Sequence, residues 1–323
     1  MTHDQLKYAL ALQTFKNFSR AAESCRISQP SLSVQIAKLE EELGVKLFDR
    51  AKSSVKVTVE GEDILKQIRV VIDETSRIND VASRVKGEVQ GAFHLGIIPT
   101  LAPALLPLFL SSFRKQNPQV RLSVDEEPTE SLIRRIGEGS LDAAVLSTPA
   151  RCPESLVEKV LFYEPFVVFA STDHPMLSNK RVTPKQILAD EILLLDDAHC
   201  FRDQVLQLCR AGHEKQGHPL RIKSGSLHTL IEIIRLEKNY TLLPLLSTSS
   251  LSKAEQKQNL RSFVQPGPTR KVSLVYHQSR LKQSIIDAIA SSIVDSIPRQ
   301  VFLTDDLVRV ISPDSRHFVP ASR

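Results

Sequence analysis

The sequence has few cysteines and no long apolar run, and both shortages restrict the class of protein. Four cysteines in 323 residues are too few for the disulfide framework of a small secreted protein. No stretch reaches the roughly 18 apolar residues of a membrane span. The opening MTHDQLKYAL lacks the basic-then-apolar order of a secretory signal. We therefore expect a cytoplasmic protein without a membrane partner, in which any disulfide is transient.

Motifs that bind metals and nucleotides are also missing. The nine histidines are scattered, and neither an HxxxH nor a CxxC spacing occurs. There is no Walker loop and no GxGxxG. We expect no metal and no cofactor.

The remaining composition is that of an ordinary soluble protein. Hydrophobic residues make up 41% of the chain and charged residues 24%, and the length suffices for two or three cores. The net charge of +5 permits binding to nucleic acid but does not establish it.

Residues 1–58 predict a winged helix-turn-helix domain. Ser19 is expected to cap a short second helix, and Ser28 to cap a third helix that ends at Gly44. The third helix has one apolar and one polar face, which is typical of a helix that lies in the major groove of DNA, although an ordinary solvent-exposed helix shows the same pattern. The apolar face is Leu32, Ile36, Leu39 and Leu43. The candidate DNA contacts are Gln29, Pro30, Ser31, Gln35 and Lys38 in the helix and Arg50, Lys52 and Ser53 in the wing.

Residues 59–86 predict one long helix without proline. Its apolar residues recur at alternating spacings of four and three, which is the seam of a coiled coil. A helix packed on its own domain is the alternative, but no apolar partner helix is evident, so we favour a dimer that binds paired DNA half-sites. The seam is Ile64, Ile68, Val71, Thr75, Ile78, Ala82 and Val85.

The remaining chain predicts a two-subdomain α/β regulatory domain. After a hinge at 87–91, strand and helix patterns alternate through 92–163 and again through 164–267, which favours parallel strands. A strand and helix at 268–297 close the domain, and 298–323 form a tail. The loop cysteine Cys152 is expected to be exposed, without a cation to activate it.

A pair of cysteines lies at the ends of an amphipathic stretch, LLLDDAHCFRDQVLQLCRAG. Cys200 is expected at the start of a helix, where the helix dipole, His199 and Arg202 favour the thiolate, while nearby aspartates oppose it. Nine residues of helix separate Cys200 from Cys209 by about 13 Å. A disulfide tolerates only about 4–7 Å between Cα atoms, so the two cysteines can bond only if the helix unwinds. The alternative is two unrelated cysteines, one of them simply buried.

Two segments carry a resemblance to a known family. The run DDAHCFRDQVLQLC resembles the sensor segment of the OxyR-type peroxide-responsive regulators of the LysR family. FSRAAESCRISQPSLSVQIAKLEEELGVKLFDR resembles the DNA-binding signature of the LysR family. The resemblance extends from residue 1 to about 297. It departs from the pattern at Ala198, where glycine is usual, at Phe201, where leucine is usual, and in the longer tail after Pro298.

The resemblance implies a sensor in which Cys200 reacts with hydrogen peroxide and Cys209 resolves it. By the same resemblance, the linker helix dimerises the chain and a homotetramer forms. It also implies a regulatory domain similar to periplasmic binding proteins, and double-stranded promoter DNA, RNA polymerase and a thiol reductant such as a glutaredoxin or thioredoxin as partners. The residues expected around the peroxide are Thr100, Thr129, His199, Asp203 and Arg270.

Two other functions stay open from the sequence. In the first, the two threonines bind a small organic effector between the subdomains, as in other LysR-type regulators. In the second, the chain is a thiol peroxidase, which leaves its helix-turn-helix without a purpose.

Overall fold

The structure is a computed structural model that divides into two compact units, residues 1–86 and 87–323. None of its described helices is long and apolar enough to cross a lipid bilayer. The described residues are 1–51, 54–85, 89–148, 152, 154–188, 192–194, 200–208, 226–278, 282–301 and 309–312.

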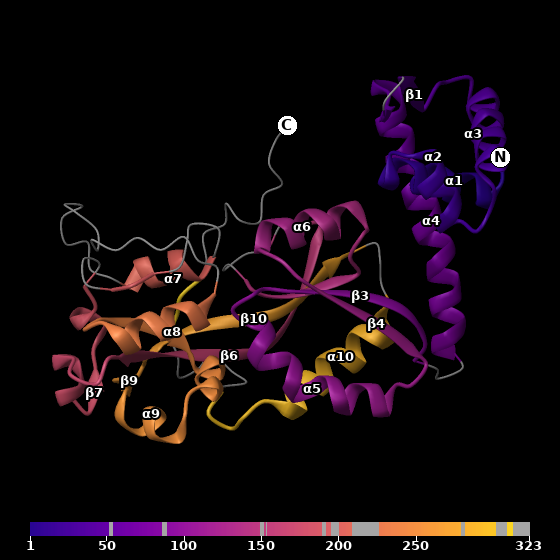
Figure 1. The fold of residues 1–323 in the computed structure, drawn as a ribbon. Helices are drawn as coiled ribbons and strands as arrows, with labels where there is room; N and C mark the ends of the chain where they lie inside the picture. Colours follow the sequence, from indigo (N-terminus) through magenta and orange to yellow (C-terminus); the bar gives the residue numbers. More distant parts are fainter. Residues whose placement is uncertain are drawn as a thin grey trace. The chain divides into compact units, whose positions relative to one another are not determined.

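The N-terminal unit is a winged helix-turn-helix, as predicted (Figure 1). Ser28 caps α3 by accepting a hydrogen bond from the backbone N–H of Ser31, and Gly44 ends α3 with a φ of 69°. The cap expected at Ser19 is wrong, because Asn17 caps α2. The elements are α1 (His3–Phe15), α2 (Phe18–Ser24), α3 (Gln29–Leu43), β1 (Phe48–Ala51), β2 (Ser54–Val57) and α4 (Val59–Val85).

A buried carboxylate joins α3 to the wing. Glu40 accepts hydrogen bonds from the backbone N–H groups of Leu47 and Phe48, at 2.8 and 3.1 Å, and from the Lys46 ammonium. Gly61 leaves no room for a side chain here, because a Cβ would lie 2.5 Å from the carbonyl oxygen of Leu47. The strands β1 and β2 are therefore held against the end of α3 and the start of α4.

The long helix α4 has a buried end and an exposed apolar stripe. The seam expected from the sequence is wrong at its N-terminal end, because Ile64 and Ile68 pack into the core of their own unit. Farther along α4 the apolar side chains are exposed, with Val71 at 41%, Ile78 at 69% and Val81 at 54%. For this part of the helix, the intermolecular seam stays a prediction.

The C-terminal unit is built on one mixed sheet. Its described strands number nine, in the order β4-β3-β5-β10-β6-β9-β7, with β11 beside β10 and β8 beside β6. The strands are β3 (Gly91–Ile97), β4 (Val120–Glu126), β5 (Ala143–Ser147), β6 (Leu156–Ala170), β7 (Arg181–Val182), β8 (Tyr240–Pro244), β9 (Leu260–Phe263), β10 (Pro268–His277) and β11 (Arg309–Val310). The helices are α5 (Ala102–Gln116), α6 (Thr129–Glu138), α7 (Cys200–Leu208), α8 (Leu227–Leu236), α9 (Lys253–Gln258) and α10 (Gln283–Ser296), with short 3₁₀ turns η1 (Pro175–Ser178), η2 (Pro184–Gln186) and η3 (Leu245–Ser250).

Two strands depart from the predicted parallel order. β3 is parallel to β4 and β5, as expected. β10 is antiparallel to β5 and β6, and β6 is antiparallel to β8 and β9, because β6 and β10 carry the chain between the halves of the unit (Figure 1). Of the strand expected in EILLLDD, the described residues form only an isolated bridge from Ile192 to Tyr240.

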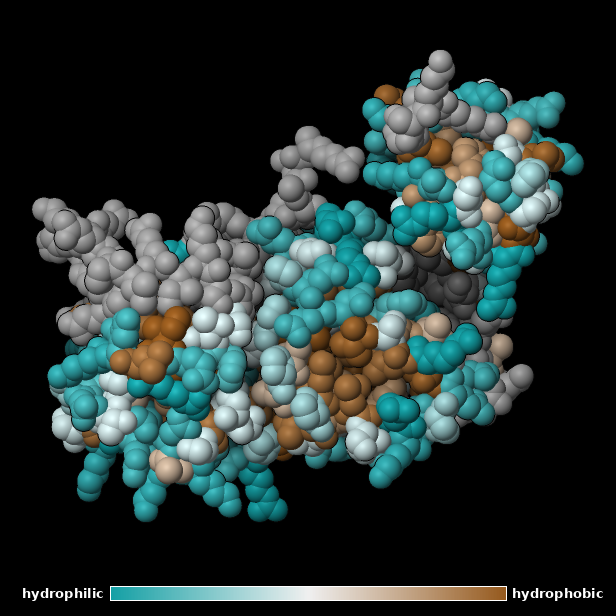
Figure 2. Space-filling model, viewed as in Figure 1, coloured by the Kyte–Doolittle hydropathy of each residue, from teal (hydrophilic) through white to brown (hydrophobic). Residues whose placement is uncertain are grey.

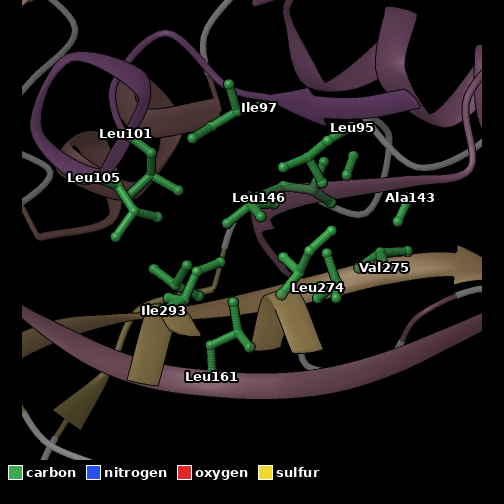
Figure 3. Close-up of a cluster of buried hydrophobic side chains, with 14 of the residues drawn as sticks. Leu95, Ile97, Leu101, Leu105, Ala143, Leu146, Leu161, Leu274, Val275 and Ile293 are labelled. Carbon is green, nitrogen blue, oxygen red and sulfur yellow. The ribbon is translucent and has the colours of Figure 1, made fainter. Parts of the chain in front are cut away.

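Each half of the C-terminal unit has its own core. Figure 3 shows the first core, where Ile97, Leu146 and Leu274 from three strands meet Leu105 of α5 and Ile293 of α10. The second core is built by the far half of β6, by β8 and by the apolar faces of α7 and α8. Figure 2 shows that apolar residues also gather on the surface over α5, where Leu108 is exposed.

The exposed part of α4 predicts how the chain assembles. An aspartate at Ile78 buries like charges across a coiled-coil seam, so Ile78→Asp should lower the mass measured by analytical ultracentrifugation. Val59→Asp is the matched control, because Val59 is exposed on the same helix but lies outside the stripe. An unchanged mass for Ile78→Asp would show that the stripe does not join two chains.

Candidate functional site

Helix α7 begins at Cys200 and ends at Leu208, so it lies where the sequence predicted it. Its apolar residues Phe201, Val205 and Leu208 are buried in the second core, and the Phe201 ring meets Phe166 edge-on at 5.6 Å between centroids. Cys200 is the first residue of the helix, as predicted. His199 and Cys209 lie outside the described residues.

The expected arginine and one expected threonine are in direct contact. Arg270 on β10 is fully buried and donates from Nη1 to the Thr100 hydroxyl at 2.9 Å and from Nη2 to the Thr100 carbonyl oxygen at 3.3 Å. Thr100 follows the end of β3 and is itself buried. Because the Thr100 hydroxyl oxygen accepts a hydrogen bond from Arg270, the Thr100 hydroxyl proton points away from Arg270. The hydroxyl can therefore donate a hydrogen bond to another group.

A glutamate that sequence reasoning missed completes this group. Glu164 on β6 is fully buried, accepts from Nε of Arg270 at 2.8 Å, and lies 2.7 Å from Nη2. Its other oxygen accepts from the backbone N–H of Leu246 at 2.7 Å. Arg270 and Glu164 stand opposite each other on the crossover strands β10 and β6. The only sequence signal for this pairing is that both residues lie on apolar strands, where a charge requires a partner.

The structure also describes two other expected residues, Thr129 and Asp203. Thr129 is the first residue of α6 and is buried, and Asp203 lies on the first turn of α7 and is partly exposed.

Gln204, another residue that sequence reasoning missed, anchors α7. It is fully buried, and its Nε2 donates to the hydroxyl of Ser147 at 3.1 Å and to the carbonyl oxygen of Ile311. Ser147 is the last residue of β5, in the other half of the unit. Helix α7 is thus joined to two segments that are distant in sequence.

Cys152 is poorly suited to react. Burial, followed by the negative charge of Glu158, raises the pKa of the Cys152 thiol to about 11. The carboxylate stays charged, because Lys271, Thr148 and Ser273 hold the pKa of Glu158 below its usual value against the opposing effect of burial. The expected exposure of Cys152 is corrected to partial burial, and its thiol is protonated at neutral pH.

A cavity of about 550 Å³ lies beside Thr100. It is lined by residues from both halves of the C-terminal unit, and Thr129 is not among the described residues that line it. The lining residues are Pro99, Thr100, Pro103, Ala104, Glu126, Ser226, Leu227, His228, Ile231, Ser247, Ser249 and Ser250.

The face of α3 that carries the expected DNA contacts is mostly exposed. Gln29, Pro30, Ser31 and Lys38 are exposed, and Val34, which sequence reasoning missed, is 52% exposed on the same side. Gln35 is partly buried, and its side-chain oxygen accepts from Gln5 at 3.2 Å. Of the wing residues, Arg50 lies on β1, whereas Lys52 and Ser53 lie outside the described residues.

Comparisons with known proteins identify both units. Residues 3–62 match the bacterial regulatory helix-turn-helix protein, lysR family, and residues 86–297 match the LysR substrate binding domain. The hydrogen peroxide-inducible genes activator of Pectobacterium carotovorum is 33% identical over 289 residues, which cover 89% of this chain and 94% of the relative. The chain belongs to the LysR family, in its OxyR branch.

Other OxyR proteins agree with this assignment. The DNA-binding transcriptional dual regulator OxyR of Escherichia coli is 33% identical, over 89% of this chain and 93% of the relative. A full-length OxyR from Pseudomonas aeruginosa, a cysteine-to-aspartate variant, has a TM-score of 0.78 at 32% identity and covers 92% of this chain and 99% of its own. This OxyR-type chain is a transcription regulator, and the thiol peroxidase hypothesis is wrong.

The buried ion pair of this OxyR-type chain predicts an asymmetric mutational effect. Arg270→Met or Glu164→Gln alone leaves one uncompensated buried charge and should cost about 3–5 kcal/mol of the free energy of unfolding. The double variant Glu164→Gln/Arg270→Met removes both charges and should recover much of that loss. Urea unfolding followed by circular dichroism measures the difference.

The exposed pair Arg134–Glu138 on α6 supplies the control for this comparison. Arg134→Met should cost less than about 1 kcal/mol, because an exposed pair contributes little. An Arg270→Met variant that is as stable as Arg134→Met would contradict the assigned ion pair.

Proposed function

We propose that the chain senses hydrogen peroxide through reversible oxidation of Cys200 and disulfide formation with Cys209, and thereby controls oxidative-stress genes. The observation that carries the proposal is the extent of α7, which begins at Cys200 and ends one residue before Cys209 in the sequence. Nine residues of helix rise about 13 Å, far beyond the separation that a disulfide allows. Oxidation therefore has to unwind α7, and a chemical change becomes a change of shape.

The chemistry needs two thiols and one peroxide. The Cys200 thiolate attacks one peroxide oxygen, the O–O bond breaks, hydroxide leaves and takes up a proton, and Cys200 becomes a sulfenic acid. Cys209 then attacks the Cys200 sulfur, the S–O bond breaks, and water leaves as the disulfide forms. The two thiols give two electrons to the peroxide, and a reductant such as a glutaredoxin or thioredoxin returns them.

The residues around the peroxide divide the remaining work. Thr100, whose proton is directed away from Arg270, donates a hydrogen bond to a peroxide oxygen. Thr129, His199 and Asp203 complete the set of polar groups that hold the peroxide in line and stabilise the departing hydroxide. Arg270 acts by holding Thr100 in place.

Relatives and solved structures support this proposal by what their names say of them. Several relatives are called hydrogen peroxide-inducible genes activators. A cysteine-to-serine variant of the OxyR of Corynebacterium glutamicum, with H2O2 bound, is 28% identical to this chain with a TM-score of 0.59, and covers 91% of this chain and 94% of its own.

The output of the sensor is DNA binding. We place the chain in the cytoplasm as a homodimer or homotetramer that binds paired half-sites of a promoter, with the α3 face at the bases and the wing at the phosphates. Repacking around α7 alters the subunit contacts and so the spacing of the DNA-binding domains. The DNA-bound chain then acts on RNA polymerase.

The cavity beside Thr100 favours a second candidate function. Its volume of about 550 Å³ suits a small organic molecule, since ligand pockets commonly measure about 300–1,000 Å³. In that case the chain answers to an effector bound between the two halves of the C-terminal unit. Transcription that depends on a ligand but not on Cys200 would distinguish this function from peroxide sensing.

Cysteine variants test the peroxide proposal. Cys200→Ser should abolish the response to peroxide, because no other thiol is placed at the helix start. Cys209→Ser should leave a sulfenic acid at Cys200 that dimedone traps, with an impaired switch. Mass spectrometry of peptides after a brief stoichiometric peroxide pulse measures both outcomes.

The other two cysteines are the controls for that experiment. Cys152→Ser should keep the response, because the raised pKa leaves its thiol protonated, and Cys25→Ser should keep it as well. A disulfide between Cys200 and Cys152, or an unoxidised Cys200, would refute the mechanism.

The exposed face of α3 predicts two distinct effects on DNA binding. Val34→Ala should remove an apolar contact in the major groove, relax the preference at one base pair and cost about 1–3 kcal/mol. Lys52→Ala should weaken binding to all sequences alike and reduce the salt dependence by about one phosphate contact. Fluorescence anisotropy on matched and mismatched half-sites at several salt concentrations separates the two. Equal losses of Val34→Ala on both DNAs would remove Val34 from the base contacts.

A further inference from the structure

Strand β11, which follows α10 in the chain, joins the sheet next to helix α7. Strand β11 is parallel to β10, with Arg309 opposite Pro268 and Val310 opposite Thr269. The backbone N–H of Arg309 donates to the carbonyl oxygen of Gly267 at 3.2 Å, and that of Ile311 donates to Thr269 at 2.7 Å. This short strand therefore has a defined register.

The side chain that follows β11 enters the core beneath α7. Ile311 is 6% exposed and belongs to the same core as Phe201, Val205 and Leu208, which form the buried face of the switch helix. Val310, its neighbour, is only partly buried. The tail thus contributes one apolar side chain to the surface on which α7 packs.

A buried hydrogen bond also joins the tail to the helix. The Nε2 group of Gln204 donates to the carbonyl oxygen of Ile311, and the same group reaches the Ser147 hydroxyl at 3.1 Å. The carbonyl oxygen can only accept, so the amide orientation of Gln204 is determined. Gln204 lies in the middle of α7, on the same turn as the buried Val205.

We propose that residues 309–312 latch helix α7 in the thiol form and so set the balance between thiols and disulfide. This inference rests on the proposed function. The oxidant is hydrogen peroxide, which takes two electrons from Cys200 and Cys209 and leaves as two waters, and the disulfide requires α7 to shorten. Shortening withdraws Gln204 from Ile311 and disrupts the packing of Phe201 and Val205 in the core that Ile311 shares. Since these contacts exist only with the helix intact, they stabilise the thiol form alone.

The latch lies outside the matched family domain. The match to the LysR substrate binding domain ends at residue 297, before β11 begins. The tail therefore adjusts the sensitivity of a sensor whose reacting residues all lie within the matched domain.

Redox titration of the full-length chain tests the latch. The fraction of Cys200–Cys209 disulfide is measured by thiol alkylation and mass spectrometry across dithiothreitol buffers of known potential. Ile311→Ala, and separately removal of residues 309–323, should shift the equilibrium about tenfold toward the disulfide, which makes the midpoint about 30 mV more negative. Val310→Ala is the matched control and should shift it far less.

Hydrogen exchange of the reduced protein supplies a second, independent reading. Amides of 201–208 should exchange faster in Ile311→Ala than in wild type, while those of β3 and β5 should not change, which shows that the fold is intact. An unchanged midpoint and unchanged exchange in Ile311→Ala would overturn the latch. A wild-type chain that forms no Cys200–Cys209 disulfide with peroxide would instead overturn the proposed function, and the redox role of the latch with it.

Discussion

The ion pair between Glu164 and Arg270 is the contact on which the C-terminal unit depends. Both side chains are fully buried, and they stand opposite each other on the two strands that carry the chain between its halves. Two buried charges are tolerated only when each has a partner and further hydrogen bonds. Here Leu246 and Thr100 supply those bonds, so the pair joins η3 and the end of β3 to the crossover strands.

The ion pair between Glu164 and Arg270 also positions Thr100, one of the residues proposed to bind peroxide. Arg270 donates to the Thr100 hydroxyl oxygen, and Thr100 also lines the cavity. Arg270 is not suited to move during a switch, because its withdrawal would leave the Glu164 carboxylate buried and without its partner charge. The element that the proposed mechanism moves is instead α7, a helix of nine residues with cysteines at its start and just beyond its end in the sequence.

Helix α7 is short and depends on contacts with other parts of the chain. An isolated helix of this length is marginal in water, so its stability comes from the core beneath Phe201, Val205 and Leu208 and from the anchor at Gln204. The two hydrogen-bond partners of Gln204 are Ser147 at the end of β5 and Ile311 in the tail, 57 and 107 residues away in the chain. Contacts made by a few residues to distant segments are the kind that one new covalent bond can break.

Local patterns determined much of this protein without any structure. The capped, amphipathic α3, the start of α7 and the alternation of strands and helices follow from spacings of three, four and two, which depend only on neighbours in the chain. The apolar face of α3 packs as its spacing predicted, and Cys200 begins its helix as expected.

Tertiary structure decided what those spacings do not encode. Ile64 and Ile68 have the periodicity of a seam yet belong to a local core, β6 and β10 run antiparallel because they cross between halves, and Glu164 and Gln204 gain their roles from partners far along the chain. Periodicity specifies which face of an element is apolar, whereas only the folded chain specifies what that face, or a buried polar group, will meet.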